Sequence, residues 1–451
     1  MPGSESNLRD RGTGLPLTAA QLGVWFAQKL DPANPSYNIA QSTEIYGPVD
    51  PTLFRAAIIQ ALVETEAFRV HFIEEGDGPR QVIDPRSESP ISLLDVSAEL
   101  DPQAAAEAWM KVDLAKAFDL LHGPLFCFAL FKAAPERFFW YQRFHHIAMD
   151  GFGGALFEQR VTEIYTALAN KLPCGENPFG SFAVLLEEDA SYRTSPRFAR
   201  DRQYWLESLA DRPELVSLSS RRSTNCNRFL RQTAYLPHSS AETLRSVALG
   251  ARAGLPEIIV VATALYLHRL TGAQELVVGL PVTGRLGAVA RRTPGMLANV
   301  LPLRLKVHPA MRLAELMDQV AQRVRRALLH QRYRTEDLLR DLGLLAHDQK
   351  LFATSVNVMP FDYDLRLAGH HTTVRNLSNG LVQDLSVVVY DQSKSSELRI
   401  DFDANPALYS TDELADHQQR FLRLLATIAA DPGQPVGQID LLAPEERHQL
   451  L

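Results

Sequence analysis

The stretch RFFWYQRFHHIAMDGFGGALF, residues 137–157, decides how the first half of the chain folds. Its first ten residues alternate between two faces, as in a β-strand, and they end in two adjacent histidines, His145 and His146. Asp150 and three closely spaced glycines follow, and glycine lets a backbone turn sharply. The next residues repeat their apolar side chains at helical period. The stretch therefore predicts a strand, a tight turn and an amphipathic helix.

The two histidines point to opposite faces of the predicted strand, so only one of them can face a given cleft. The residues alone leave two interpretations open. One is a pair of hydrogen-bonded histidines at the end of a core strand. The other is an acid–base site, which the strand-end position, the glycine turn and the nearby carboxylate of Asp150 favour. A metal ion needs three or four converging ligands, and these side chains do not obviously converge, so no metal site is predicted.

The bulk properties are those of an ordinary globular chain. Its 451 residues are enough for two to three domains, and hydrophobic residues make up 46%. The net charge of −7 argues against nucleic acid or an anionic membrane as the main partner. The three cysteines, Cys127, Cys174 and Cys226, are far apart, which fits a reducing compartment.

No segment has the pattern of a signal peptide or a membrane span. The N-terminal residues 1–14 are polar and carry both signs of charge, so we expect a disordered leader there. The most apolar helical stretch, residues 257–270, is too short to cross a bilayer and is expected to be a core helix. The prediction is a cytoplasmic protein that binds no membrane.

Helix and strand signals run along the whole chain. Thr18 and Gln21 have capping-box spacing, as do Ser410 and Glu413 before a helix over 411–430, and Asp50 with Pro51 opens another helix. Further helices are expected over residues 105–118, 155–168, 183–211, 241–249, 256–270 and 311–329. Strands are expected over residues 39–47, 68–75, 79–84, 125–133, 136–146, 230–237, 275–285, 351–359, 385–391 and 397–403. Because strands and helices do not alternate regularly, the expected fold class is an α+β sandwich in two halves.

The segment HHIAMDG, residues 145–151, fits the pattern HHxxxDG, and with it the chain resembles the condensation domains of nonribosomal peptide synthetases. The HHxxxDG pattern alone is shared with related acyltransferases. Further segments match the family in order: LTAAQLGVWFAQKL (17–30), AFRVHF (67–72), NPFGSFAVLLEEDASYR (177–193), VVGLPVTGR (277–285), MLANVLPLR (296–304), HQRYRTEDL (330–338) and the linker-like ending IDLLAPEERHQLL (439–451).

The resemblance implies two lobes of the chloramphenicol acetyltransferase type in a V shape, with a tunnel between them. On this basis the N-terminal lobe is expected over 15–175 and the C-terminal lobe over 176–436, with a Pro- and Gly-rich boundary at 171–182. Residues 437–451 are then a linker towards a downstream adenylation domain.

The implied activity is amide formation between an acyl donor thioester and the amine of a carrier-bound aminoacyl acceptor. The resemblance implies a catalytic motif of His145, His146, Asp150 and Gly151, with His146 at the reaction centre. Asp150 is implied to be structural and held by Arg285, because a lone buried carboxylate is costly and a guanidinium is its usual partner. Arg69 is implied to be a supporting residue, and Asn357 and Phe152 are implied to line the tunnel; for Arg69 and Asn357, packing is an equally open role.

No bound cofactor is implied; 4'-phosphopantetheine of carrier domains, or coenzyme A, would present the substrates. The implied partners are donor and acceptor peptidyl carrier domains. ETEAF (64–68) stands where the family has R-H-E, and FGGALF (152–157) lacks a serine common in the family. These departures resemble starter domains of siderophore and lipopeptide synthetases. Two alternatives stay open: a free-standing acyltransferase that makes an ester or amide, and a non-catalytic recruitment domain of the same fold.

Overall fold

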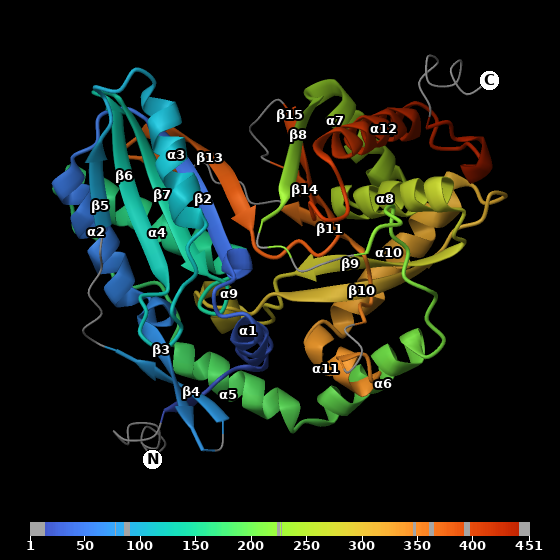
Figure 1. Cartoon of the computed structure of the whole chain (residues 1–451), viewed down its shortest axis with the longest axis horizontal. Helices are drawn as coiled ribbons and strands as arrows, with labels where there is room; N and C mark the ends of the chain where they lie inside the picture. Colours follow the sequence, from blue (N-terminus) through green and yellow to red (C-terminus); the bar gives the residue numbers. More distant parts are fainter. Residues whose placement is uncertain are drawn as a thin grey trace. The chain divides into compact units, whose positions relative to one another are not determined.

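The computed structural model describes residues 14–76, 78–84, 91–222, 226, 228–345, 349–359, 365–391 and 397–441. By its internal contacts the chain forms two compact units (Figure 1). Unit 1 comprises Met1–Arg193, Arg285–Leu297 and Leu365–Gly380. Unit 2 comprises Thr194–Gly284, Ala298–Asp364 and Leu381–Leu451. The secondary structure is α+β, as expected.

The units are not the two continuous lobes expected over 15–175 and 176–436. Two later segments return to unit 1, and the first break lies after Arg193. Hydrogen bonds explain the shift. The backbone N–H of Phe182, at the start of helix α5 (Phe182–Arg193), donates to Glu66 Oε2 at 2.7 Å, and Asp189 Oδ2 accepts from the N–H of Ala19 at 3.0 Å. These bonds attach α5 to unit 1.

Unit 1 is built on a six-stranded mixed sheet with the order β12-β13-β2-β7-β6-β5. Its strands are β12 (Arg366–Leu367), β13 (His370–Asn379), β2 (Asn38–Tyr46), β7 (Arg137–His145), β6 (Phe126–Ala134) and β5 (Ile91–Asp95). A smaller sheet has the order β1-β4-β3, from β1 (Leu15–Pro16), β4 (Gly78–Ile83) and β3 (Val70–Glu75). The predicted pairing of β3 with β4 is confirmed, whereas the turn residue between them lies outside the described residues.

Helices cover both faces of the large sheet of unit 1, with α3 (Pro102–Leu114) in front of β6 and β7 in Figure 1. On this face Trp109 makes edge-to-face contacts with Phe131 and Tyr141. On the other face lie α2 (Pro51–Glu64) and α4 (Gly151–Ala169), and there Phe54 of α2 packs edge-to-face on Trp140 of β7. The expected alternation of strand 136–146 therefore places its aromatic rings in both layers. The remaining helices of unit 1 are α1 (Ala19–Leu30), η1 (Pro35–Tyr37), η2 (Glu66–Arg69), α5 and α9 (Ala288–Arg292).

Unit 2 has its own six-stranded mixed sheet, with the order β10-β9-β11-β14-β15-β8. The strands are β10 (Asn299–Lys306), β9 (Glu275–Val282), β11 (Thr354–Met359), β14 (Leu385–Tyr390), β15 (Glu397–Ala404) and β8 (Leu230–Pro237). Its helices are α6 (Pro196–Leu209), α7 (His238–Gly250), α8 (Leu255–Thr271), α10 (Leu313–Leu329), α11 (Thr335–Asp341), α12 (Thr411–Ala430) and the short η4 (Val436–Gln438).

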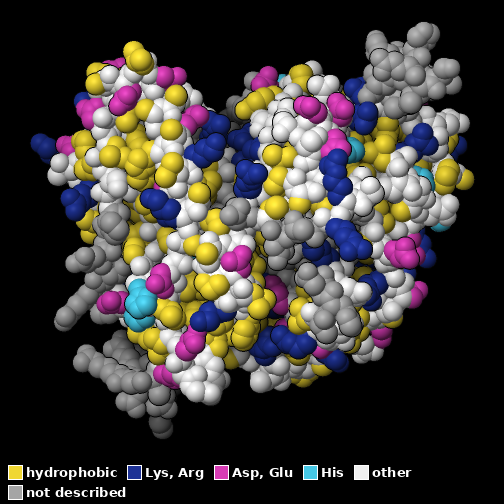
Figure 2. All heavy atoms as spheres, in the orientation of Figure 1, with side chains coloured by type: hydrophobic (Ala, Val, Ile, Leu, Met, Phe, Trp, Pro, Cys, Tyr) yellow, Lys and Arg dark blue, Asp and Glu magenta, His cyan; other side chains and the backbone are white. Residues whose placement is uncertain are grey.

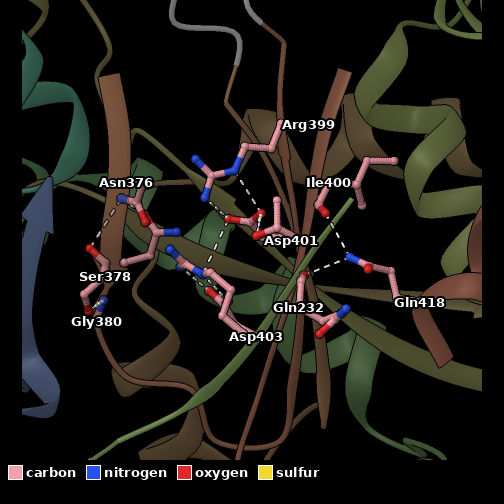
Figure 3. Close-up of polar contacts among 12 residues, drawn as sticks. Gln232, Asn376, Ser378, Gly380, Arg399, Ile400, Asp401, Asp403 and Gln418 are labelled. Atoms are coloured by element: carbon pink, nitrogen blue, oxygen red, sulfur yellow. Dashed lines mark hydrogen bonds and ion pairs between the residues drawn. The ribbon is translucent and has the colours of Figure 1, made fainter. Parts of the chain in front are cut away.

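One face of this second sheet is apolar and the other carries charge. Ile400 and Phe402 of β15 belong to the apolar core that α8 and α12 share. The intervening residues point to the opposite face, where Arg399 forms two hydrogen bonds with Asp401 (2.9 and 2.7 Å), drawn in Figure 3. Asp403 is held in the same way by Arg231, at 2.7 Å to each oxygen. Both buried carboxylates are therefore paired, as burial requires.

Capping residues start the helices where the sequence placed them. Thr18 and Gln21 form the predicted capping box of α1, and Ser410 and Glu413 form that of α12. Asp50 caps α2, as predicted, and its carboxylate accepts from the backbone N–H groups of Thr52 and Leu53. Helix α12 covers the predicted range 411–430.

Several sequence predictions need correction. The helix expected over 183–211 is two helices, α5 and α6, because Ser195 caps a new helix that begins at Pro196. The helix expected over 105–118 starts and ends earlier, since Asp101 caps it. Strand β7 ends at His145, so His146 already belongs to the turn. The sequence pattern also did not predict strands β5, β10 and β13.

The ends of the chain lie largely outside the described residues. Of the expected leader, only Gly14 is described. Of the expected linker 437–451, the described part packs on unit 2: the N–H of Gly437 donates to the carbonyl of Pro309 at 2.9 Å, and Ile439 and Leu441 are buried. The part over 442–451 is not described.

The surface mixes charges of both signs. Figure 2 shows Lys and Arg, Asp and Glu, and hydrophobic side chains interspersed over the viewed face. In the described ranges, no single helix is long and apolar enough to cross a membrane, although α7 and α8 together pass the length and composition test as a pair bent by 95°.

Candidate functional site

The turn between β7 and α4 is held by backbone hydrogen bonds on both sides. The N–H of His145 donates to the carbonyl of Leu125, and the N–H of His146 donates to the carbonyl of Tyr37 at 2.8 Å. The carboxylate of Asp150 then caps α4 by accepting from the N–H of Gly153 at 2.8 Å. The sequence folds this way because strand pairing ends at His145 and a capping residue starts the helix five positions later.

His145 is buried, with both ring nitrogens engaged inside the protein. Its Nε2 lies 3.0 Å from Oε1 of Gln28, and its Nδ1 accepts from the N–H of Ile147 at 3.1 Å. Because Nδ1 accepts, the ring is the neutral tautomer that donates from Nε2. Burial, with smaller contributions from His146 and Arg143, lowers the pKa of His145 to about 3. The ring is therefore neutral at physiological pH and tied to its neighbours.

Gln28 is a site residue that the sequence analysis missed. Its Nε2 donates to three carbonyls, those of Asp31, Pro32 and Asn34, at 3.0–3.2 Å. Gln28 thus joins His145 to the loop that ends in Tyr37, the residue that anchors the backbone of His146. A polar side chain on the buried stripe of α1 was the available signal, since Gln28 is 3% exposed.

His146 differs from the other two titratable residues of the motif in its burial. Its side chain is partly exposed, whereas those of His145 and Asp150 are fully buried. It is also the first residue of the turn, so its ring is not part of the strand's alternating pattern. Of the two histidines, His146 is therefore the one with solvent-accessible side-chain surface.

The expected ion pair between Asp150 and Arg285 is present and deeply buried. Arg285 Nη1 lies 2.6 Å from Asp150 Oδ2, and the two side chains are 1% and 2% exposed. The same oxygen accepts from the N–H of Leu297 at 2.9 Å, and Arg285 Nη2 donates to the carbonyl of Gly295 at 3.0 Å. Although burial by itself raises the pKa of Asp150, the attraction of Arg285 and these hydrogen bonds outweigh it and lower the pKa. Asp150 is an ionised structural anchor.

The first turn of α4 packs closely on the 285–297 segment. A side chain at Gly153 would place its Cβ 2.9 Å from the backbone N of Gly295 and 2.5 Å from Sδ of Met149. A residue larger than glycine at position 153 would therefore require Met149 or the backbone of Gly295 to move. Phe152 itself lies under the guanidinium of Arg285, with the ring centroid 4.7 Å from Cζ.

Gly151 is the first residue of α4, at the end of the helix where backbone N–H groups have no partner within the helix. A helix N-terminus stabilises negative charge. The structure thus brings this N-terminus, the two histidines, Asp150, Phe152 and Arg285 into one cluster within unit 1.

The other two predicted site residues lie elsewhere. Arg69 ends η2 in unit 1, and its buried Nε has no hydrogen-bond partner among the described residues. Asn357 lies in unit 2, on β11, where it pairs with Val388 of β14. Their supporting and tunnel roles stay predictions. In the described ranges no group of three or more His, Cys, Asp or Glu side chains could hold a metal ion.

The comparisons agree with this geometry. The family model named Condensation domain matches residues 12–451. The chain is 47% identical over 435 residues to the dimodular nonribosomal peptide synthase of Bacillus subtilis, covering 96% of this chain and 18% of that protein. It is 44% identical to the isonitrile lipopeptide synthase of Streptomyces coeruleorubidus, covering 94% of this chain and 29% of the relative. The chain thus spans less than a third of either relative.

Solved structures agree as well. A variant of the starter condensation domain of rhizomide synthetase, in complex with C8-CoA, superposes with a TM-score of 0.91 at 47% identity, covering 95% of this chain and 98% of that one. The first condensation domain of the calcium-dependent antibiotic synthetase superposes with a TM-score of 0.90 at 34% identity, covering 96% of this chain and all of the other. Sequence, fold and motif geometry therefore agree that this chain belongs to the condensation-domain family of nonribosomal peptide synthetases, acyltransferases that form amide bonds.

Proposed function

We propose that this chain joins an acyl donor, presented as a thioester, to the amine of an aminoacyl acceptor, with His146 as the acid–base group. The observation that carries the proposal is that the side chains of His145 and Asp150 are bound inside the protein, whereas that of His146 is partly exposed. His145 has both ring nitrogens engaged, and the carboxylate of Asp150 is bound to Arg285 and two backbone N–H groups. Of these three titratable side chains, only that of His146 is partly exposed.

Amide formation from a thioester and an amine requires only a weak base. The pKa of an α-amino group is about 7.7–8.0, so part of the acceptor is already uncharged near neutral pH. Attack on the thioester carbonyl forms the C–N bond and leaves an extra proton on nitrogen. Neutral His146 accepts this proton and can return it to the departing thiolate sulfur, which restores the histidine. Orientation of the two substrates and exclusion of water supply the rest of the acceleration.

The N-terminus of α4 supports the same step. Negative charge develops on the thioester oxygen during attack, and preorganised N–H groups stabilise such charge. Gly151 has its N–H at the first position of the helix. The N–H of Gly153, two residues later, donates to the capping carboxylate of Asp150. Asp150 and Arg285 act as positioning residues, because their pair fixes this helix end on the 285–297 segment.

The relatives suggest which substrates to try first. A variant of the rhizomide synthetase starter domain is known in complex with C8-CoA and Leu-SNAC, an acyl thioester and an aminoacyl thioester. Two further relatives are an isonitrile lipopeptide synthase and, at 31% identity, enterobactin synthase component F of Escherichia coli O157:H7. We propose an aliphatic or aryl acyl donor on coenzyme A or on carrier phosphopantetheine, an aminoacyl acceptor on a second carrier domain, and a cytoplasmic location.

Intact-protein mass spectrometry tests the proposal. An acceptor carrier loaded with an amino acid is mixed with this protein and, in turn, with aryl, short acyl, long acyl and aminoacyl thioesters. A mass gain equal to one acyl group, lost in His146→Ala, supports amide formation and identifies the donor class. Carrier binding without any mass gain would overturn the proposal in favour of a recruitment role. Base also cleaves the thioester to the carrier, so the mass of the released product distinguishes the two linkages: an amide keeps the acyl group on the amino acid, whereas an ester loses it.

A further inference from the structure

The last strand of unit 1, β13, has an irregularity in its pairing with β2 near its end. Asn376 pairs with Gln41 and Ser378 pairs with Ala40, so Leu377 is an extra residue in the ladder. Leu377 packs against the apolar cluster beneath α3. Such a bulge bends its strand and re-aims the residues that follow, and bulges are common beside active sites.

Hydrogen bonds fix the residues after the bulge. The hydroxyl of Ser378 donates to the carbonyl of Asn38 at 2.8 Å, and the N–H of Gly380 donates to Oγ of Ser378 at 3.2 Å. The amide of Asn376 donates to Oδ1 of Asn379 at 2.9 Å. Asn376, Ser378 and Gly380 are drawn along this strand end in Figure 3. The position of Gly380 is therefore set by the strand and is not that of a loose loop.

Gly380 lies against the imidazole of His146. A Cβ built on Gly380 would be 3.4 Å from Cδ2 of His146 and 3.7 Å from the carbonyl oxygen of Ser36. Cδ2 is bonded to Nε2, so the backbone of Gly380 borders the ring edge that carries this nitrogen. Gly380 has a φ of +95°, a conformation that residues with side chains rarely adopt.

During the reaction, part of the acceptor amino acid must lie beside this edge of the imidazole, where Gly380 has no side chain. A base must lie about 2.6–3.2 Å from the amine nitrogen that it deprotonates. The α-carbon of the acceptor is one C–N bond of about 1.46 Å further on. The α-carbon and its substituent therefore come within van der Waals range of whatever flanks the imidazole.

We propose that Gly380 is a specificity-determining residue, which keeps room beside His146 for the α-substituent of the acceptor amino acid. The inference rests on the proposed function, because it requires that His146 deprotonates the amine of the acceptor. A side chain at position 380 would compete with the acceptor side chain for the same space. Glycyl acceptors, which have no α-substituent, would be affected least.

The test compares Gly380→Ala with wild type on glycyl, alanyl and leucyl thioester acceptors and one donor. The expected result is a fall of roughly tenfold or more in the leucyl-to-glycyl ratio of kcat/KM. One methylene group in a closed site changes the discrimination between two substrates by at least about that factor. Gly380→Asn, whose larger side chain tolerates positive φ better, should lower the ratio further and covers the case in which the alanine variant folds poorly.

Gly369→Ala is the matched control. Gly369 precedes the same strand and has a φ of +88°, but a Cβ there would meet nothing within 4 Å. It should lower Tm through backbone strain and leave the ratio unchanged. An equal loss for all acceptors in the Gly380 variants, or the same ratio change in Gly369→Ala, would overturn the inference. Absence of amide formation by the wild type would instead overturn the proposed function.

Discussion

Arg285 and Asp150 are 135 residues apart in sequence, yet they form an ion pair of 2.6 Å in which both side chains are almost completely buried. The pair joins the start of α4 to the 285–297 segment, and both belong to unit 1. A buried charge that loses its partner is strongly destabilising, so this contact should dominate the local stability around His146.

Removal of one partner of this pair should therefore unfold the site. We expect Arg285→Gln to lower the free energy of unfolding by roughly 3–5 kcal/mol and to abolish amide formation. Urea denaturation followed by circular dichroism measures the first effect. Glu74→Gln is the control, because it breaks the exposed pair with Lys29 and should cost less than about 1 kcal/mol. Equal stability of the two variants would contradict the structural role of Asp150.

The two histidines should separate activity from stability. His146→Ala should lower kcat by about 10²–10⁴ and change Tm little, because its side chain is partly exposed. His145→Ala should lower the free energy of unfolding by about 1–3 kcal/mol, because Gln28 and the N–H of Ile147 lose a buried partner. Rate assays and denaturation of both variants check this. The opposite pattern would assign the reaction to His145.

His145 should also make the protein sensitive to acid. Its pKa is lowered to about 3 from an ordinary value of 6.5, so at intermediate pH only the unfolded chain takes up this proton. The free energy of unfolding should therefore fall as pH drops from about 6.5 towards 3. In His145→Gln this slope should be shallower, which denaturation at a series of pH values measures. An unchanged slope would mean that the ring is protonated in the folded protein.

Glu158 should act in the opposite direction. It is buried in α4 and accepts hydrogen bonds from Thr43 and from Gln41. Burial raises its pKa to about 7 from an ordinary 4.5. Between these values the unfolded chain has lost its proton and the folded chain has kept it. The free energy of unfolding should fall by on the order of 3 kcal/mol as pH rises through this window.

The neutral analogue Glu158→Gln checks this second pH effect. Glutamine does not titrate, so position 158 of the variant should contribute nearly the same free energy of unfolding at about pH 5 and about pH 8. The stability of the variant relative to wild type should therefore rise at the higher pH, as denaturation at the two pH values would show. If wild type and variant followed parallel pH profiles, Glu158 would have to be ionised in the folded state.

Glu64, the first residue of the ETEAF segment, forms an ion pair whose contribution to stability can be tested. Glu64 is paired with Arg160 of α4 through two hydrogen bonds of 2.6 and 3.0 Å, and Arg160 also donates to the carbonyl of Cys174. In a double-mutant cycle, Glu64→Gln and Arg160→Met should show a coupling of about 0.5–3 kcal/mol. Additive effects on the free energy of unfolding would mean that the pair contributes nothing to the attachment of α4.

Local signals in the sequence predicted the elements well. Thr18, Asp50 and Ser410 cap helices where expected, because a capping hydrogen bond involves residues only two or three positions apart. The strand and turn around His146 follow from alternation and glycine placement in the same way. The single helix expected over 183–211 failed because the helical pattern resumes directly after the short break at Ser195.

The sequence by itself determined the HHxxxDG motif, the order of most strands and helices, and through its resemblance the partner of Asp150. Only the tertiary structure decided that Gln28 holds His145, that β13 joins the first sheet, and that Gly380 borders His146. These contacts join residues more than a hundred positions apart, and β13, HHTTVRNLSN, has too few apolar residues to show a strand pattern. Its place comes from pairing with β2, which depends on the packing of the whole unit and on no local periodicity.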